Sequence, residues 1–310
     1  MNVTFLGTGA GAPSRHRNVS SMALRLPERG DLWLFDCGEG TQHQFIRSDL
    51  RISRVSRIFI THLHGDHLFG LIGLLSTCSL AGDPKRIDIH GPEGLEEYIE
   101  VSLRLSGTTL GFPFSVHEVR EGTIVEDGGF RVRCRRLLHR METFGYRVDE
   151  PERAGRFDTA AAVALGIPPG PIYGQLKHGE TVMLDDGREI DGADLCGPVE
   201  RGRSVVYATD TIYTPEAVEL ARGADLLIHE ATFSEADREI AELSLHSTAA
   251  MAARVALEAE VGRLLLTHVS VRYPGMNGGG TNPLLDEARA IFPATEMAAD
   301  FMTIDLPRHM

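Results

Sequence analysis

The stretch Phe59–Gly70, FITHLHGDHLFG, decides the fold, because it places several metal-binding side chains directly after an apolar strand. His62 and His64 are two residues apart, so in an extended segment they lie on the same face. Asp66 and His67 follow around the turn and can face a second ion. Imidazole and carboxylate groups bind zinc, and they also bind manganese and iron. The stretch therefore predicts a metal centre at the end of a strand.

Four side chains cannot complete two metal sites, so the remaining ligands are expected elsewhere. The segments FRVRCRRLLH, RSVVYATD and RLLLTH each have the pattern of a strand that ends in a ligand, namely His139, Asp210 and His268. Functional groups gather at strand ends in open sheets. The predicted ligands of the first ion are His62, His64 and His139. Those of the second ion are Asp66, His67 and His268, and Asp210 bridges the two.

Apolar strand-like runs and helical patterns alternate along all 310 residues, without a strict βαβ rhythm. This alternation predicts an α/β protein with mixed sheets. The predicted strands are Val3–Leu6, Leu32–Phe35, Arg57–Thr61, Arg86–His90, Phe130–Leu138, Ser204–Ala208, Leu226–His229 and Leu264–Thr267. The predicted helices are Leu68–Leu80, Gly94–Leu105, Pro215–Arg222, Ser247–Glu258 and Pro283–Ile291.

The composition narrows the class of protein. The apolar content of 42% suits a globular protein with a sizeable core, and no apolar run approaches the roughly 20 residues of a membrane helix. The N-terminus resembles a first strand more than a signal peptide. The four cysteines lie far apart and form no CxxC, which favours reduced thiols in the cytosol over a cysteine zinc site. The net charge of −13 alone argues against a nucleic-acid partner, although bound divalent ions would reverse the local sign.

The segment 149–198 differs from the rest, with ten acidic and four basic residues and the Gly- and Pro-rich run GIPPGPIYGQLKHG. Within it, TVMLDDGREI predicts a small hairpin that turns at Asp186-Gly187. Two interpretations are open: a surface excursion or linker, or an arm that grips a substrate.

The run GTGAGA, Gly7–Ala12, fits a loose dinucleotide-binding pattern. Its context does not fit, because Pro13 follows at once and the next residues have no apolar helical period. We expect instead a tight turn that brings backbone near the metal centre.

Through THLHGDH the sequence resembles the metallo-β-lactamase superfamily, and more narrowly the ribonuclease Z family of tRNA 3′-processing endonucleases. The resemblance covers nearly the whole chain. It is carried by FLGTGAGAPSRHRNVSS, LFDCGEGTQHQ, GPIYGQLKHG, ADLLIHEATF, LHSTAAMAA, LLLTHVSVRY and IFPATEMAADF.

This resemblance implies a single αββα domain over residues 1–310, with two mixed sheets face to face, helices outside, and 149–198 as a protruding, flexible tRNA-binding arm. It implies the same seven ligands, with Asp66 also the general base, His246 a proton donor and Glu230 its support. The implied RNA contacts are Arg15, Arg17 and Asn18 at the acceptor end and Lys177 on the arm. The implied assembly is a cytoplasmic homodimer with two zinc ions per subunit and no membrane contact.

The implied reaction is hydrolysis of the phosphodiester after the discriminator nucleotide of a tRNA precursor. One alternative is a hydrolase of the same fold that acts on small phosphodiesters or related esters. Another is a non-catalytic, metal-stabilised RNA-binding protein. Two positions depart from the family pattern: Thr209 stands where a glycine usually precedes the bridging aspartate, and Arg15 stands where lysine is frequent. If position 209 needs a positive φ, Thr209 would be strained.

Overall fold

The computed structural model describes residues 1–82, 86–273 and 282–308. The chain forms two compact units. The larger unit contains Met1–Glu126, Arg131–Val148 and Ser204–Leu306, and the smaller one has Asp149–Arg203 as its main segment.

Two mixed sheets of seven strands form the larger unit. The first sheet has the order β18-β1-β3-β4-β5-β6-β7, with antiparallel pairs as far as β4 and parallel pairs from β4 to β7. Its strands are β18 (Thr303–Asp305), β1 (Asn2–Gly7), β3 (Ser21–Leu26), β4 (Asp31–Phe35), β5 (Val55–Phe59), β6 (Ile87–Gly91) and β7 (Phe114–Glu118).

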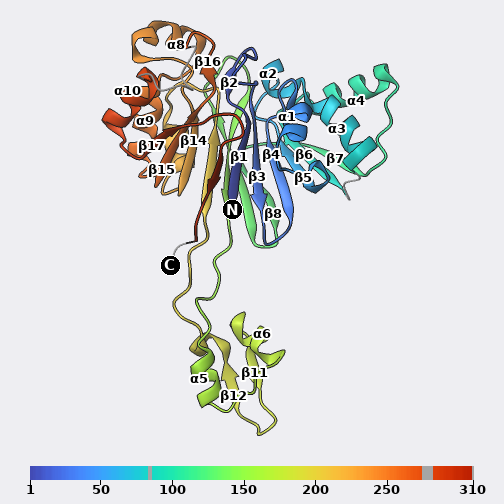
Figure 1. Ribbon diagram of the computed structural model, residues 1–310, viewed down its shortest axis with the longest axis vertical. Coiled ribbons are helices and arrows are strands. Elements are labelled where there is room, and N and C mark those ends of the chain that lie inside the picture. Colours follow the sequence, from blue (N-terminus) through green and yellow to red (C-terminus); the bar gives the residue numbers. More distant parts are fainter. Residues whose placement is uncertain (83–85, 274–281, 309–310) are drawn as a thin grey trace. The chain divides into compact units, whose positions relative to one another are not determined.

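The second sheet has the order β17-β15-β14-β13-β10-β9-β8, and its strands from β17 to β13 are parallel. Its strands are β17 (Thr295–Met297), β15 (Arg263–Thr267), β14 (Leu226–Glu230), β13 (Ser204–Ala208), β10 (Thr143–Asp149), β9 (Phe130–Leu137) and β8 (Gly122–Asp127). A short parallel pair, β2 (Gly9–Ala10) with β16 (Val269–Ser270), lies at one edge of the sheets, beside α2 (Gly65–Leu68) (Figure 1).

Aromatic side chains join the two sheets face to face. The ring centroid of Phe35 on β4 lies 5.7 Å from that of Tyr207 on β13, and Phe59 on β5 lies 5.4 Å from Tyr146 on β10. All four side chains are at most 3% exposed, so this interface is a dry core that holds the sheets in register.

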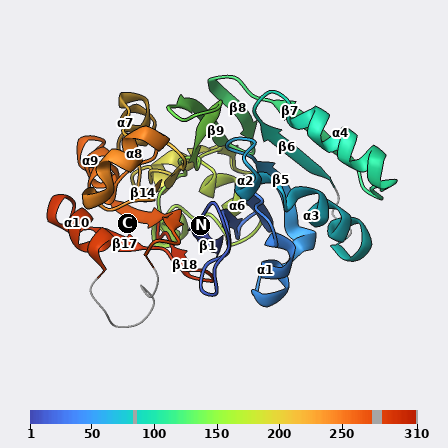
Figure 2. The same cartoon turned by 90° about the horizontal axis from the view of Figure 1, so that it is seen from above.

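Helices cover the outer face of each sheet (Figures 1 and 2). One apolar cluster joins the first sheet to α1 (Thr41–Arg47), α3 (Leu71–Thr77) and α4 (Leu95–Ser106). Another joins the second sheet to α7 (Pro215–Ala221), α9 (Ala249–Glu258) and α10 (Pro283–Ile291). The predicted αββα sandwich is confirmed. Among the described helices, none combines the length and hydropathy that a membrane span requires.

The predicted single helix Leu68–Leu80 is wrong. In the structure this stretch is divided among the end of α2, the helix α3 and a π-helical turn at Cys78–Gly82, and the chain breaks between α2 and α3 at Gly70. A Cβ added at Gly70 would lie 2.0 Å from the carbonyl oxygen of Gly38, and the Gly70 amide donates to Cys37. This close approach fixes the turn that carries Asp66 and His67 away from the strand.

The smaller unit has its own apolar core. It contains α5 (Thr159–Ala164), α6 (Ile172–Lys177) and the hairpin of β11 (Thr181–Met183) and β12 (Glu189–Asp191). The hairpin turns as predicted at Gly187, which has a φ of 85°. The core residues are Ala162, Ile167, Tyr173, Leu176 and Leu195.

His90 on β6 is a buried histidine outside the metal centre. Its ring is stacked between Phe59, at 5.1 Å, and His117, at 4.7 Å. Neither ring nitrogen has a hydrogen-bond partner among the described residues. Burial, with the nearby His117 and Arg57, lowers the pKa of His90 to about 4. The folded chain therefore disfavours a proton on this ring.

We predict that His90→Phe reduces the loss of stability in acid. Since the folded-state pKa lies below the unfolded value, the unfolded chain binds more protons between about pH 6.5 and pH 4, and stability falls as the pH falls through this window. The variant should lose about 2 kcal/mol less unfolding free energy than the wild type between pH 7 and pH 5. Urea unfolding of both metal-free proteins measures the difference, and parallel pH profiles would contradict the prediction.

Candidate metal centre

The structure brings the seven predicted ligands together from four strand ends and one short helix. His62 and His64 follow β5, Asp66 and His67 lie on α2, and the other three follow β9, β13 and β15. Ligand atoms of His62, His64, His139 and Asp210 lie within 4.8 Å of one another, and so do those of Asp66, His67 and His268. The distant segments therefore converge on one site with two groups of ligands.

Asp210 faces both groups, with one oxygen toward each. Its Oδ1 lies 3.1 Å from Nε2 of His67 and 3.3 Å from Nε2 of His268. Its Oδ2 lies 3.7 Å from Nε2 of His62 and 3.9 Å from Nε2 of His139. This is the geometry that a bridging carboxylate needs.

The backbone is left-handed at two of these residues. Asp210 has a φ of 50° and His268 a φ of 55°, a region that side-chain-bearing residues rarely adopt. Such conformations carry a cost of about 1–3 kcal/mol and cluster at functional sites. The strain considered for Thr209 is not found there, because Thr209 does not have a positive φ. The residue with the strained backbone is its neighbour Asp210.

Asp36 orients two of the histidines. Its Oδ2 lies 2.7 Å from Nδ1 of His67, and both its oxygens accept the Thr61 hydroxyl, at 3.0 and 3.1 Å. Because Thr61 donates to Asp36, its oxygen accepts from Nδ1 of His62 at 2.9 Å. Tyr207 donates to the same carboxylate at 3.1 Å. One fully buried carboxylate thus fixes the ring orientation of His67 directly and that of His62 through Thr61.

Glu230 does the same for a second pair of histidines. It lies 2.9 Å from Nδ1 of His246 and accepts the Thr232 hydroxyl at 2.5 Å. Thr232 in turn accepts from Nδ1 of His268 at 2.8 Å. The Glu230 side chain is fully buried and also accepts the backbone amides of Thr211 and Ser247.

The ring nitrogens that face inward fit metal ligation. The outward nitrogen Nδ1 faces the Asp36 carboxylate in His67 and the Leu245 carbonyl in His139. Both partners can only accept a hydrogen bond, so the proton of each neutral ring lies on Nδ1 and the inward Nε2 atom carries a lone pair. These inward nitrogens face other ligands closely: Nε2 of His67 lies 3.3 Å from Nε2 of His268. The Asp210 Oδ1 atom is buried and makes no hydrogen bond of ordinary geometry within the described part of the chain. Lone pairs and a carboxylate oxygen that converge in this way can hold a metal ion between them.

Burial and the neighbouring charges shift the pKa values of several candidate ligands. Burial works against a charge on His67, but Asp210 and Asp36 outweigh it and raise the pKa of His67 well above its usual value. These carboxylates therefore favour a positive charge at Nε2 of His67, which either a second proton or a metal ion in its place can supply. Burial lowers the pKa values of His62, His64 and His139, which stay neutral and free to act as ligands. Burial also opposes ionisation of Asp66, yet its hydrogen bonds to His268 and His67 lower the pKa of this carboxyl.

His246 lies beside the candidate ligands, and its pKa is raised above the usual value. Burial opposes protonation, but the adjacent Glu230 carboxylate outweighs it and raises the pKa of His246 to about 9. Its Nδ1 lies 3.9 Å from Asp210 Oδ2. Because Glu230 occupies Nδ1, Nε2 is the nitrogen left to serve a substrate.

The glycine-rich run at the N-terminus forms the expected tight turn. No helix follows it, and the Gly11 amide donates to Asp66 Oδ2 at 2.8 Å. This backbone contact, which links the β2–β16 edge to α2, fixes the Asp66 carboxylate from the open side of the site.

The predicted RNA contacts differ in how far they are exposed to solvent. Arg15 is exposed, and Asn18 donates to the Glu39 carbonyl at 2.9 Å. Arg17 departs from expectation, since it is only 8% exposed and its guanidinium donates to Thr8 and to the Ala298 carbonyl. This geometry supports a role in anchoring the C-terminal segment instead of contacting RNA. Lys177 lies in the smaller unit, exposed, above the ring of Phe157.

Sequence reasoning missed the residues that orient the ligands, namely Asp36, Thr61 and Thr232. A signal was present for Asp36, because LWLFD has the same pattern of an apolar strand ending in a carboxylate as the strand before Asp210. The threonines carry no such signal, since threonine is common in strands.

We predict that Asp36→Asn lowers metal affinity by about 10- to 100-fold, the usual range for a residue that orients ligands. The amide keeps the size of the side chain, but it has only one oxygen. It therefore cannot accept from the Thr61 hydroxyl and the His67 imidazole in the way that the two carboxylate oxygens do. Competition with a fluorescent zinc chelator measures the affinity. The control is Asp225→Asn, which removes a carboxylate that holds Ser204 outside the site. Equal affinity in Asp36→Asn and wild type would contradict the prediction.

Comparison with known proteins agrees with this fold. Residues 181–269 match the family model for a beta-lactamase superfamily domain, and residues 1–150 match that for the anti-Pycsar protein Apyc1. The crystal structure of the short form of human tRNase Z is similar, with a TM-score of 0.72 and 34% identity over 99% of this chain and 100% of that chain.

Full-length relatives are closer in sequence. Ribonuclease Z of Nostoc sp. is 61% identical over 308 residues, which cover 99% of this chain and 96% of the relative. Ribonuclease Z of Cyanothece sp. is 58% identical over 310 residues, covering 100% and 97%. The αββα sandwich with its histidine- and aspartate-lined centre defines a protein of the metallo-β-lactamase fold. With these relatives, the chain belongs to the ribonuclease Z family, as its sequence motifs predict.

Proposed function

We propose that this chain is a metal-dependent endoribonuclease that removes the 3′ trailer of tRNA precursors by hydrolysing the phosphodiester after the discriminator nucleotide. The observation that carries the proposal is a two-group ligand cluster bridged by Asp210, with His246 beside it, in a chain 61% identical to a ribonuclease Z.

The proposed cofactors are two zinc ions per subunit, held by the seven ligands, with manganese or iron as substitutes. Such ions, when bound, lower the pKa of a water molecule and stabilise charge on the reacting phosphate. The chain contributes fixed ligand rings, through Asp36 and Glu230, and a site whose buried groups favour positive charge. That charge attracts phosphate despite the net charge of −13.

We assign roles to three residues beside the metal ligation. Asp66 Oδ2, which faces the Gly11 amide and two imidazoles, is the general base. His246 is the general acid that protonates the departing ribose 3′-oxygen, which is a poor leaving group otherwise. Glu230 is a positioning residue that holds His246 protonated and turned toward the substrate.

We also propose that 149–198 is an inserted tRNA-binding arm within one metallo-β-lactamase domain. Its compact fold supports this, because a structured unit presents exposed side chains such as Lys177 in a fixed arrangement. Arg15 and Asn18 remain the proposed contacts to the acceptor end. A homodimer in the cytoplasm is proposed as well, and the four cysteines, all unpaired, agree with a reducing compartment.

The decisive experiment is cleavage of a precursor tRNA by the purified, zinc-loaded protein, with the ends mapped. Cleavage after the discriminator that stops on chelation and returns with zinc supports the proposal. Hydrolysis of small phosphodiesters without tRNA cleavage would favour the alternative hydrolase. Binding without any cleavage would favour the non-catalytic protein.

Deleting Gly166–Gly179 tests the arm. We expect precursor binding to weaken by about tenfold or more, because contacts with the RNA backbone are lost. Hydrolysis of bis(p-nitrophenyl) phosphate, which has no tRNA body for an arm to bind, should be unchanged. Lys177→Ala should show a smaller loss of the same kind. Equal losses on both substrates would contradict a role confined to tRNA binding.

A further inference from the structure

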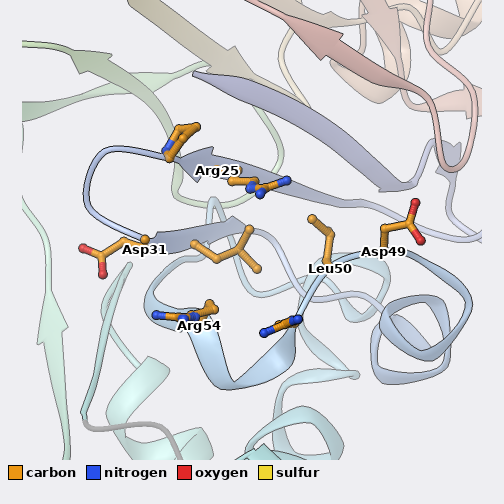
Figure 3. A pocket seen from close by; sticks show the side chains of 9 residues that line it. Arg25, Asp31, Asp49, Leu50 and Arg54 are labelled. Atoms are coloured by element: carbon orange, nitrogen blue, oxygen red, sulfur yellow. The ribbon is translucent and has the colours of Figure 1, made fainter.

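A basic pocket lies in the larger unit, away from the metal centre. It has a volume of about 360 Å³, and its charged lining residues are Arg25, Arg51, Arg54, Asp31 and Asp49. Arg25 is on β3, Asp31 begins β4, and the other three lie between α1 and β5. In Figure 3 the carboxylates of Asp31 and Asp49 lie at opposite edges of the pocket, with Leu50 between them.

The three arginines of this pocket have no partner among the described residues. Asp31 is already bound to Arg29 at 3.0 Å. Among the residues that the structure describes, Arg25, Arg51 and Arg54 make no ion pair and no side-chain hydrogen bond. Other exposed arginines do find carboxylates, as Arg238 does with Glu235 at 2.6 Å. Three free guanidinium groups on a chain of net charge −13 form a local excess of positive charge.

The backbone leaves room for a ligand among these groups. Gly30, with a φ of 72°, closes the β3–β4 turn, and an added Cβ there would lie 3.4 Å from Arg54 Nη1. Leu32, 2% exposed, and the half-buried Leu50 form an apolar floor. Charges above an apolar floor are less screened than those in open water, which strengthens their attraction for an anion.

A second hollow shares part of its lining with the first. Arg25, Asp49 and Leu50 line both, and the second adds Arg47, which lies over the Phe301 ring at 4.9 Å. A single small anion needs only one hollow. Two adjacent hollows with four arginines suit a chain of phosphates, and guanidinium groups are well matched to phosphate oxygens.

We propose that Arg25, Arg47, Arg51 and Arg54 form a binding site for the phosphodiester backbone of RNA. The identity of the polyanion as RNA rests on the proposed function, whereas the phosphate chemistry does not. Arg54 precedes β5 and His62 follows it, so the site lies on the order of 20 Å from the metal centre along that strand. It would therefore touch RNA several nucleotides from the reacting bond and contribute to binding without entering the chemistry.

The test is the double variant Arg51→Gln/Arg54→Gln, compared with the matched variant Arg104→Gln/Arg222→Gln, which removes two exposed arginines elsewhere. Fluorescence anisotropy with precursor tRNA in EDTA measures binding without turnover. We expect about a tenfold weaker Kd at 0.1 M salt and a smaller slope of log K against log salt, by about one to two. Hydrolysis of bis(p-nitrophenyl) phosphate and the Tm should match the wild type.

Each outcome decides the proposal. A loss of tRNA affinity no greater than in the matched variant would overturn it. Inorganic pyrophosphate binding that disappears in Arg51→Gln/Arg54→Gln, with tRNA binding unchanged, would overturn the RNA assignment and leave a small-anion pocket. If the wild type binds tRNA but never cleaves it, the proposed function fails, while a selective loss of binding in the double variant still supports this site.

Discussion

Asp210→Asn is expected to lower precursor cleavage by on the order of 10³-fold or more, because it removes a carboxylate that faces both ligand groups. The amide has nearly the same volume, so the fold should remain. It offers one oxygen in place of two and turns a donor toward one group of histidines. We therefore expect less than two equivalents of zinc per chain after dialysis, measured by elemental analysis alongside activity.

The control is Glu239→Gln, which neutralises an exposed carboxylate on α8 (Arg238–Ser244). It should retain wild-type zinc content and activity, which separates the effect of the site from that of net charge. If Asp210→Asn keeps two zinc ions and cleaves at the wild-type rate, Asp210 does not bridge the ions, and the assignment of the ligands must change.

The convergence of the seven candidate ligands could be predicted from the sequence because the relevant signal is local. Each strand that leads to a candidate ligand is an apolar run closely followed by His or Asp. These strand ends come from both sheets, β5 from the first and β9, β13 and β15 from the second, and they meet because the two sheets pack face to face. The strands β3 and β10 were not predicted, although each is well formed. β3 is buried on both faces except at Arg25, so it lacks the alternation that marks a half-exposed strand.

The supporting network could not be predicted in the same way. Asp36 and His67 are 31 positions apart and meet only because β4 and β5 pair in a particular register. The burial of Arg17 likewise depends on the C-terminal segment, since it donates to the Ala298 carbonyl, 281 positions away. A basic local motif indicates charge, but only the packing of distant segments decides whether that charge reaches solvent.

His246→Ala is expected to lower kcat for precursor tRNA by about 10²- to 10⁴-fold, the usual range for loss of a general acid or base. The zinc content should stay at the wild-type value, because Glu230 already occupies Nδ1 of His246 at 2.9 Å. Loss of zinc would instead make His246 a ligand, an arrangement that its place near Asp210 and His268 also permits.

The leaving group distinguishes acid catalysis from a structural role of His246. A precursor with sulfur in place of the bridging 3′-oxygen expels a thiolate, which needs no proton from the enzyme. If His246 protonates the leaving oxygen, His246→Ala should cleave this substrate at nearly the wild-type rate while remaining slow on the natural one. A structural role predicts the same loss on both substrates.

Glu230→Gln should follow the same pattern with a smaller loss of activity, because the His246 imidazole remains in place but the carboxylate that favours its proton is gone.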